Sequence, residues 1–400
     1  MDANTPHTPL DFTNTEVAFA LKSTSELKQA ALLFKALSYP RLVGAGKVAS
    51  DLSSRLHLPV GWALKPTIYR HFVAGETLVK SLPAVRRIYA QGAQCVMDYS
   101  AEGGDTDAAT RDNYEANLRA VRFVGTHPEL SHAVFKVSGI AKVPALVKFS
   151  EQTDSLTPAE QKEIMLLRER FMTLCRTAHD LSVPILVDAE HYAYQDLIDQ
   201  LTEEAMELFN QEKPIVFATL QMYRRDRLPY LRHLLTLAQE KNLKIGVKFV
   251  RGAYMEEERE RAEKMGYPDP ICPTKEATDV NYDQGVAFAL SHLEVFELFC
   301  GTHNEESCLK IAQMMQNLGL EPNDRRIYMA QLYGMSDNLT YNLAHAGYRV
   351  SKYVPYAPVN KVLPYLVRRA QENTSLEGQT GRELQLIRTE LRRRKEAEKE

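Results

Sequence analysis

Short apolar runs alternate with longer amphipathic stretches over most of the chain after residue 93. Eight short apolar or β-branched runs lie at 93–98, 133–138, 184–189, 214–221, 244–254, 294–304, 326–332 and 348–354. Short apolar strands separated by segments long enough for a helical crossover are typical of βαβ units, whose parallel strands are buried on both faces. Eight in succession favour a closed (βα)8 barrel. An open doubly wound sheet is the alternative, but no G-x-G-x-x-G follows the first run.

The pattern differs on either side of this repeat. From Thr15 to Gly92 the apolar spacing is helical, with several prolines and no convincing strand. We therefore expect an N-terminal helical arm over 1–92 and a barrel over 93–375. The remaining residues, 376–400, end in LRRRKEAEKE and predict a charged, solvated amphipathic helix. A docking element for a partner or a membrane surface is the alternative interpretation of this tail.

Composition narrows the class of protein. The chain has 400 residues, 44% of them hydrophobic, and a formal charge of −3. This excludes a disordered chain and gives no overall field that would attract nucleic acid, so we expect a small-molecule partner. The five cysteines are scattered without a C-x-x-C pair, which argues against a disulfide framework and a zinc knuckle. With no signal sequence and no membrane-spanning run apparent, we expect a cytoplasmic protein, with peripheral attachment to the inner membrane left open.

Polar residues gather toward the C-terminal ends of the eight apolar runs. They are Asp98, Lys136, Asp188, Gln221, Arg251, His303, Gln331 and Tyr353. In a (βα)8 barrel the C-terminal ends of the strands carry the chemistry. The sequence therefore predicts an active site at this end of the barrel.

A second cluster of polar residues follows the eighth run. Tyr365, Arg368, Arg369 and Glu372 are spaced i, i+3, i+4 and i+7, so on a helix they share one face. Adjacent guanidinium groups repel each other unless an anion lies between them, and their planar fork fits a carboxylate. We interpret this face as a carboxylate-binding site. The alternative is a solvated basic face paired with Glu372.

Six segments closely resemble, in order, those of the proline dehydrogenase family. They are VDAEHYAYQDLID, TLQMY, VKFVRGAYMEEER, GTHN, AQLYGM and YVPYAPVNKVLPYLVRRAQEN. The resemblance covers about 93–375, and DFTNTEVAFALKS is similar to the N-terminal segment of single-function members. It implies a distorted (βα)8 TIM-type barrel, an N-terminal helical segment, noncovalent FAD at the C-terminal strand ends and a last helix that caps the flavin. It implies no metal.

The resemblance also implies roles for individual residues. The residues of the catalytic site would be Lys136, Asp188, Tyr353, Tyr365, Arg368, Arg369 and Glu372. By this resemblance the two arginines and the lysine hold the proline carboxylate, and the glutamate orients the arginines. The tyrosines pack against the proline ring, and the aspartate helps to fix the lysine and the flavin.

The cofactor residues are likewise assigned by resemblance. Those expected at the isoalloxazine and the ribityl-pyrophosphate are Gln221, Lys248, Arg251, Gly252, Ala253 and Tyr254. Those expected on the adenosine side are Thr274, Lys275 and Thr278, and further polar groups at the sixth and seventh strand ends are Thr302, His303, Asn304 and Gln331. The chemistry agrees, because a cation near flavin N1, N5 or C2=O stabilises the anionic reduced flavin.

The family's reaction is the oxidation of L-proline to Δ1-pyrroline-5-carboxylate, the first step from proline to glutamate. We expect hydride transfer from C5 to flavin N5, electrons passing to a membrane quinone, and a separate pyrroline-5-carboxylate dehydrogenase for the next step. Two departures from the family pattern are Ala357, where many members have glycine, and VMDYSAEGG, which leaves the roles of Tyr99 and Glu102 open.

Two rival functions remain at this point. A hydroxyproline dehydrogenase performs the same chemistry, but the ring of Tyr353 should crowd a 4-hydroxyl group. A barrel metallohydrolase could use Asp188, Glu190, His191 and His303 as ligands. Against it, no H-x-H follows the first run, and residues 190 and 191 would point to opposite faces of a strand.

Overall fold

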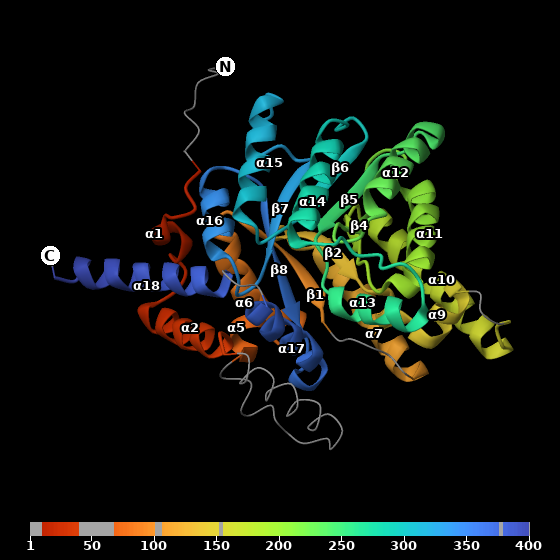
Figure 1. Ribbon diagram of the computed structural model, residues 1–400, viewed down its shortest axis with the longest axis horizontal. Coiled ribbons are helices and arrows are strands. Elements are labelled where there is room, and N and C mark those ends of the chain that lie inside the picture. The colour runs from red at the N-terminus through yellow and green to blue at the C-terminus, as the bar shows by residue number, and fades with distance from the viewer. Residues whose placement is uncertain (1–9, 40–67, 101–105, 152–154, 376–378, 400) are drawn as a thin grey trace. The chain divides into compact units, whose positions relative to one another are not determined.

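The computed structural model describes residues 10–39, 68–100, 106–151, 155–375 and 379–399 (Figure 1). All eight expected strands are present, and they close into a barrel in sequence order. The strands are β1 (Gln94–Tyr99), β2 (Leu130–Phe135), β3 (Ile185–Val187), β4 (Val216–Gln221), β5 (Ile245–Val250), β6 (Phe296–Gly301), β7 (Ile327–Leu332) and β8 (Val350–Tyr356). The predicted (βα)8 barrel is confirmed. Every residue of β4 and of β8 is buried, as expected for parallel strands covered on both faces.

The chain divides into two compact units, one formed by 1–102 with 331–400 and the other by 103–330. In the second unit β2 to β6 pair in parallel with their sequence neighbours, for example Lys248 opposite Thr219 and Phe299. Its helices are α7 (Asp107–Val124), α8 (Val137–Ile140), α9 (Val143–Glu151), α10 (Pro158–Asp180), α11 (Tyr192–Phe209), α12 (Arg227–Lys241), α13 (Met255–Met265), α14 (Lys275–Leu290) and α15 (Glu305–Asn317).

Local sequence explains where several of these helices begin. Thr157 and Glu160 form a capping box at the start of α10, in which each side chain accepts a hydrogen bond from the other residue's backbone N–H. Thr106 and Thr274 cap α7 and α14 without such a box, since each side chain only accepts a hydrogen bond from the backbone N–H three residues later. These caps fix the residues at which the three helices begin.

In the first unit β1 pairs with β8, with Val96 opposite Tyr353. Its helices are α1 (Thr15–Ala18), α2 (Thr24–Leu37), α5 (Arg70–Phe72), α6 (Leu78–Tyr89), α16 (Asp337–His345), α17 (Val359–Ser375) and α18 (Gln379–Ala397). Proline at position 83 lies inside α6 and proline at 364 inside α17. The described part of the N-terminal segment is helical, as predicted.

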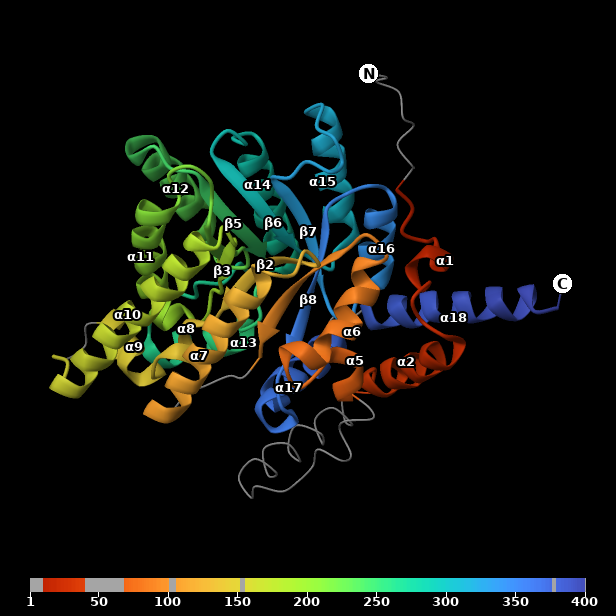
Figure 2. The same ribbon diagram turned by 180° about the vertical axis from the view of Figure 1, so that it is seen from behind.

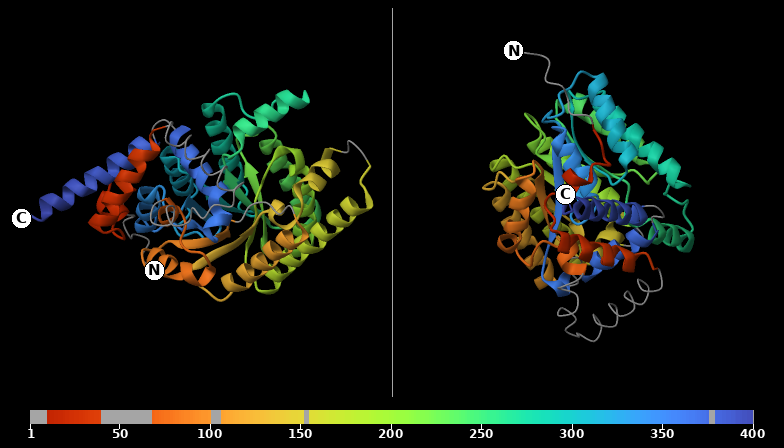
Figure 3. Two further views of the ribbon diagram at one scale, coloured as in Figure 1. Left: turned by 90° about the horizontal axis from the view of Figure 1, so that it is seen from below. Right: turned by 90° about the vertical axis from the view of Figure 1, so that its left-hand side faces the viewer.

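The C-terminal helix α18 lies alongside α2 (Figures 2 and 3). Ile387 packs in a buried apolar cluster with Phe34 of α2. Glu390 is fully buried, and its carboxylate accepts hydrogen bonds from Thr15 Oγ1 at 3.0 Å and Arg394 Nε at 2.7 Å. The expectation of an amphipathic helix is met, but the helix is solvated on one face only, since the other face forms part of the core of the first unit.

Candidate active site

A buried cluster of three charges lies at the C-terminal ends of the strands in the second unit. Asp188 directly follows β3, and its carboxylate is 2.5 Å from Lys136 Nζ and 2.5 Å from Lys248 Nζ. Lys136 directly follows β2, and Lys248 lies within β5. The backbone N–H of Asp188 donates a hydrogen bond to the carbonyl of Phe135 at 3.0 Å, which fixes the end of β3 against the end of β2. The side chains of Asp188 and Lys248 are each 8% exposed, and that of Lys136 is 18% exposed.

The electrostatics of this cluster keep its aspartate ionised. Burial opposes ionisation of Asp188, but the charges and hydrogen bonds of Lys136 and Lys248 hold the pKa of its carboxyl well below the usual range. Glu190 lies nearby and accepts a hydrogen bond from Ser138 N at 2.8 Å and another from the Ser138 hydroxyl. Burial raises the pKa of Glu190. The two lysines therefore keep the aspartate firmly ionised and hold it between their ammonium groups.

The end of β4 and the loop after β5 carry further predicted cofactor residues. Gln221, the last residue of β4, is buried, and its Oε1 accepts no hydrogen bond from the residues described. Gly252 has a φ of +137°, and a Cβ built there would lie 2.5 Å from the ring of Tyr223. Any larger residue would be strained at this position. Ala253 beside it is exposed, so the backbone of this loop is accessible to a ligand.

Arg251 is held as a fixed cation. Its Nε donates to Asp279 Oδ1 at 2.6 Å, Nη1 to Thr302 Oγ1 at 2.7 Å and Nη2 to Ser307 Oγ at 3.0 Å. Its guanidinium also lies over the ring of Tyr282, 4.4 Å from the centroid. A guanidinium has five N–H donors, so two remain for a ligand after these three bonds.

The residues assigned to the adenosine side have roles in the fold as well. Thr274 caps α14, and its carbonyl accepts from Thr278 Oγ1 at 3.2 Å. Lys275 is exposed and pairs with Asp279 at 2.6 Å. Asn304 caps α15 through Ser307 N at 3.1 Å. His303, between Thr302 and Asn304, is half-buried. A role at a cofactor remains a prediction for these residues.

The remaining predicted residues belong to the first unit. Tyr353 is buried in β8, and Gln331 is buried near the end of β7, where its Oε1 accepts from Thr340 Oγ1 at 2.8 Å. Tyr365 and Arg369 are buried on α17, with the guanidinium 5.2 Å from the centre of the tyrosine ring. Arg368 beside them is half-buried.

This burial contradicts the interpretation of the α17 face as a solvated basic surface. Tyr365 belongs to a buried apolar cluster with Leu366, Met335 and Phe72, so this face of α17 contributes to the core of the first unit. A guanidinium is buried at such a place only when charge or ring contacts compensate for lost water. The side chain of Glu372 lies outside the described residues, as does Glu102.

The argument from strand faces against a metal site at residues 190 and 191 is wrong. β3 ends at Val187, so both residues lie in the loop before α11. Glu190 is instead bound to Ser138, and His191 lies 3.3 Å from a carboxylate oxygen of Glu258. Within the described residues, no group of three or more His, Cys, Asp or Glu side chains could hold a metal ion.

Sequence reasoning missed the acidic partners in this region. Asp279, which fixes Arg251, stands four residues after Lys275 on α14, and this i, i+4 spacing is a signal that could have identified it. Glu258 has no such local signal, because its contacts to the 191–192 segment join residues far apart in sequence.

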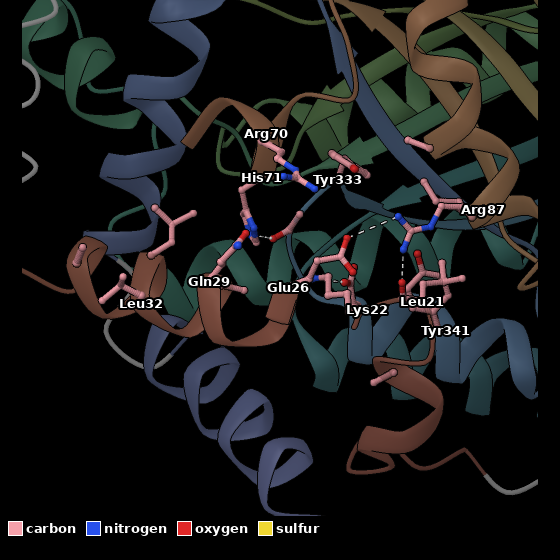
Figure 4. Close-up of a pocket in the computed structure, with 18 residues that line it drawn as sticks. Leu21, Lys22, Glu26, Gln29, Leu32, Arg70, His71, Arg87, Tyr333 and Tyr341 are labelled. Atoms are coloured by element: carbon pink, nitrogen blue, oxygen red, sulfur yellow. Dashed lines mark hydrogen bonds and ion pairs between the residues drawn. The ribbon is translucent and has the colours of Figure 1, made fainter. Parts of the chain in front are cut away.

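A cavity of about 490 Å³ opens in the first unit among α1, α2, α5, α6 and the loop before α16 (Figure 4). Its charged residues are largely paired, with Lys22 2.7 Å from Asp337 and Arg87 3.7 Å from Glu26. Apolar side chains such as Leu33 form much of the rest of its wall. No predicted site residue lines it, so this cavity is not the predicted active site.

Within the described parts of the chain, no helix combines the length and apolar character needed to cross a membrane.

Comparison with known proteins gives a consistent result. A family model described as proline dehydrogenase matches residues 81–382. The chain is 30% identical to proline dehydrogenase 1, mitochondrial, of Arabidopsis thaliana, over 97% of this chain and 87% of that protein. It is 31% identical to a hydroxyproline dehydrogenase of Xenopus laevis, over 94% and 88%. Among solved structures, proline utilization A from Bdellovibrio bacteriovorus inactivated by N-propargylglycine is similar in fold, with a TM-score of 0.71, 19% identity, and coverage of 92% of this chain and 38% of that one.

Proposed function

Since this chain belongs to the proline dehydrogenase family, it is an oxidoreductase that acts on the CH–NH group of proline, and we propose that noncovalent FAD is its hydride acceptor. The product would be Δ1-pyrroline-5-carboxylate. The observation that carries the proposal is the buried Lys136–Asp188–Lys248 cluster, whose two ammonium groups suit an anionic substrate and the anionic form of a reduced flavin.

The residues of the second unit fit a flavin. Gln221 offers a buried amide oxygen with no partner among the described residues, which suits a ring N–H donor. Lys248 supplies a buried cation, and Gly252 supplies backbone without a side chain at an exposed position. Arg251 supplies two N–H donors in a fixed orientation. When bound there, FAD would supply the two-electron acceptor for the hydride.

The carboxylate of proline would be held by Arg368, Arg369 and Lys136. Arg369 is buried and rests on the ring of Tyr365, so its guanidinium loses little further freedom when it binds a carboxylate. Tyr353 and Tyr365 would pack against the apolar ring of the substrate. The α17 helix would then act mainly by orientation, since it would fix C5 of proline toward the hydride acceptor.

The amine of proline must lose its proton before hydride can leave C5, because a protonated nitrogen has no lone pair to form the C=N bond. We propose that this proton passes to solvent. We further propose that the electrons pass to a membrane quinone and that a separate dehydrogenase consumes the product. The cytoplasm, with peripheral contact to the inner membrane, is the proposed location.

Proline is preferred over hydroxyproline as the substrate. The chain is similar to relatives of both names at nearly equal identity, so overall similarity does not separate the two. The proposal rests on Tyr353, which is 9% exposed in β8 and would fill the space beside C4 of the substrate ring. No observation favours the hydroxylated substrate.

Arg369→Met tests the proposal. We expect kcat/KM for L-proline to fall roughly 10- to 100-fold, because a charge-assisted hydrogen bond is worth about 1.5–3 kcal/mol. The visible flavin spectrum of the purified protein should be unchanged. Arg388→Met, at an exposed position on α18, is the matched control and should behave as wild type. Normal kinetics in Arg369→Met would remove this arginine from the site, and a wild-type protein that binds no flavin would refute the cofactor proposal.

A further inference from the structure

A histidine outside the predicted site packs against the end of the cofactor loop. The loop 251–254 joins β5 to α13, and its last residue, Tyr254, is half-buried. The ring of His191 lies 4.3 Å from the ring of Tyr254, centre to centre, at an interplanar angle of 33°. His191 comes from the separate segment between β3 and α11.

Two carboxylates hold this histidine in place. His191 Nδ1 is 3.3 Å from Glu258 Oε1, and Nε2 is 3.7 Å from Glu257 Oε2. Glu258 is 1% exposed, and the same Oε1 accepts a hydrogen bond from Tyr192 N at 2.8 Å. Glu258 therefore ties the first turn of α11 to the first turn of α13, where a carboxylate is favoured by both helix dipoles.

The charge of His191 matters to this arrangement. Burial opposes its protonation, but Glu258, Glu257 and Glu190 together raise the pKa of the imidazole above its usual value. Tyr254 and Tyr194 are the other titratable groups with rings near it, at 4.3 and 6.1 Å. A protonated imidazole over a tyrosine ring gains a cation–π contact, and it also satisfies the buried carboxylate of Glu258.

The first two residues of the loop are held by a separate set of contacts. Tyr223 N donates to the carbonyl of Arg251 at 2.7 Å, and the ring of Tyr223 lies against Gly252. Arg251 is fixed by Asp279 and Thr302. The first two residues of the loop are thus held by these contacts, and the ring of Tyr254, its last residue, packs against His191.

We propose that His191 is a positioning residue: as an imidazolium held by Glu258, it stacks on Tyr254 and fixes the 251–254 loop in the shape that receives the cofactor. This inference rests on the proposed function, because it assumes that the loop binds FAD. His191 itself touches neither substrate nor cofactor in this scheme.

A dependence on pH follows. The raised pKa means that the folded loop binds the proton of His191 more tightly than an unfolded chain does. The contribution of protonated His191 to the order of the loop is therefore complete below about pH 6.5, the ordinary pKa of histidine. It is lost as the pH rises through the raised pKa of His191 in the folded protein.

Two variants separate the ring from the charge. His191→Phe keeps an aromatic ring on Tyr254 but loses the ion pair, and His191→Gln keeps hydrogen-bonding capacity but loses the ring. His233→Phe is the matched control, because His233 also pairs with a glutamate, Glu203 at 3.1 Å, and stacks near a tyrosine, but is 53% exposed on α12.

The first measurement is the affinity of the apoprotein for FAD between pH 5.5 and 9. Wild type should bind FAD about threefold to tenfold more tightly than either His191 variant at pH 5.5, and this advantage should shrink as the pH rises. Both His191 variants should lack that pH-dependent step, and His233→Phe should match wild type. If the FAD affinity of His191→Phe changes with pH in parallel with that of wild type, the role of the charge is overturned. If His233→Phe loses as much affinity as the His191 variants, the effect does not come from the contact of His191 with the 251–254 loop.

The second measurement needs no cofactor. Amide hydrogen exchange at residues 254–258, where Glu258 N donates to the carbonyl of Tyr254, should be faster in apo His191→Phe than in apo wild type at pH 6. Failure of wild type to bind FAD would refute the proposed function alone, since the exchange experiment would still test His191. Unchanged exchange at 254–258 would refute the inference whatever the result with FAD.

Discussion

Replacing Asp188 with asparagine removes one charge from the Lys136–Asp188–Lys248 cluster and leaves the shape of the side chain almost unchanged. Packing should therefore be preserved, and the effect should be electrostatic. The carboxylate lies 2.5 Å from each ammonium group and is 8% exposed, so little water can replace it. Both lysines would be left close together with their shared counter-charge gone.

The magnitude can be worked from the burial of the partners. Removing one member of a buried ion pair costs about 3–5 kcal/mol, because the other charge is left uncompensated. Lys248 is buried to this degree, whereas Lys136 is 18% exposed and recovers part of its hydration. We therefore expect Asp188→Asn to lower the free energy of unfolding by about 3–5 kcal/mol rather than twice that amount.

The pH dependence of this loss is fixed by the direction of the pKa shift. The two lysines lower the pKa of Asp188 in the folded state. Its stabilising contribution is therefore present above the ordinary aspartate value near 3.8 and is lost as the pH falls toward the lower folded value. The difference between wild type and Asp188→Asn should be constant from pH 7 to about pH 5 and should shrink in more acid solution.

Urea unfolding followed by circular dichroism measures the effect. Lys136→Met added to Asp188→Asn should recover part of the lost stability, because it removes one of the two lysine charges that position 188 no longer neutralises. Glu115→Gln serves as a control, since Glu115 pairs with Arg119 at 3.8 Å on the exposed face of α7 and should contribute less than 1 kcal/mol. A loss below about 0.5 kcal/mol in Asp188→Asn, or strict additivity in the double variant, would show that the cluster is not coupled as argued.

Three further outcomes are expected. Burial raises the pKa of Glu383 to about 7, so the stability that its bound proton contributes is present below pH 4.5 and is lost as the pH rises through 7. Glu383→Gln should therefore be more stable than wild type by about 2–4 kcal/mol at pH 8 but not at pH 4. An equal difference at both pH values in thermal unfolding would contradict this. Tyr353→Ser should raise KM for proline and increase the ratio of kcat/KM for trans-4-hydroxy-L-proline to that for proline, by an amount worth about 1–3 kcal/mol; an unchanged ratio would remove Tyr353 from the ring pocket. The purified protein should be yellow, lose its flavin on denaturation and bleach with excess L-proline in the absence of oxygen; a colourless protein that FAD does not restore would contradict the cofactor proposal.

The barrel was predictable because its strands are buried on both faces. Apolar content alone therefore located all eight strands, including the three-residue β3. The ends were less accurate where polar residues followed. The run at 244–254 contains β5 only over Ile245–Val250, and the run at 294–304 contains β6 over Phe296–Gly301. The excess residues belong to loops whose conformation is set by contacts such as that of Tyr223 with Gly252, which leave no periodic signal.

The charge cluster could be predicted only in part. Resemblance grouped Lys136 with Asp188 but placed Lys248 among the flavin residues, whereas in the structure one carboxylate joins all three. Asp188 is 52 residues from Lys136 and 60 from Lys248, so no local spacing relates them. What brings them together is the register of β2 to β5 in the barrel, which is a property of the whole sheet.

The face of α17 shows why spacing alone can mislead about burial. The i, i+4 relation of Tyr365 and Arg369 correctly places the two side chains together, and the guanidinium does lie over the ring. The same relation cannot say what covers the face, so the sequence left both a carboxylate-binding face and a solvated basic face open. In the structure Arg369 is 6% exposed and Tyr365 5%, because Phe72 and Met335 pack in the same apolar cluster as the tyrosine. A cation buried beside a ring in this way needs contacts that compensate for its lost water, and the stacked tyrosine supplies one of them.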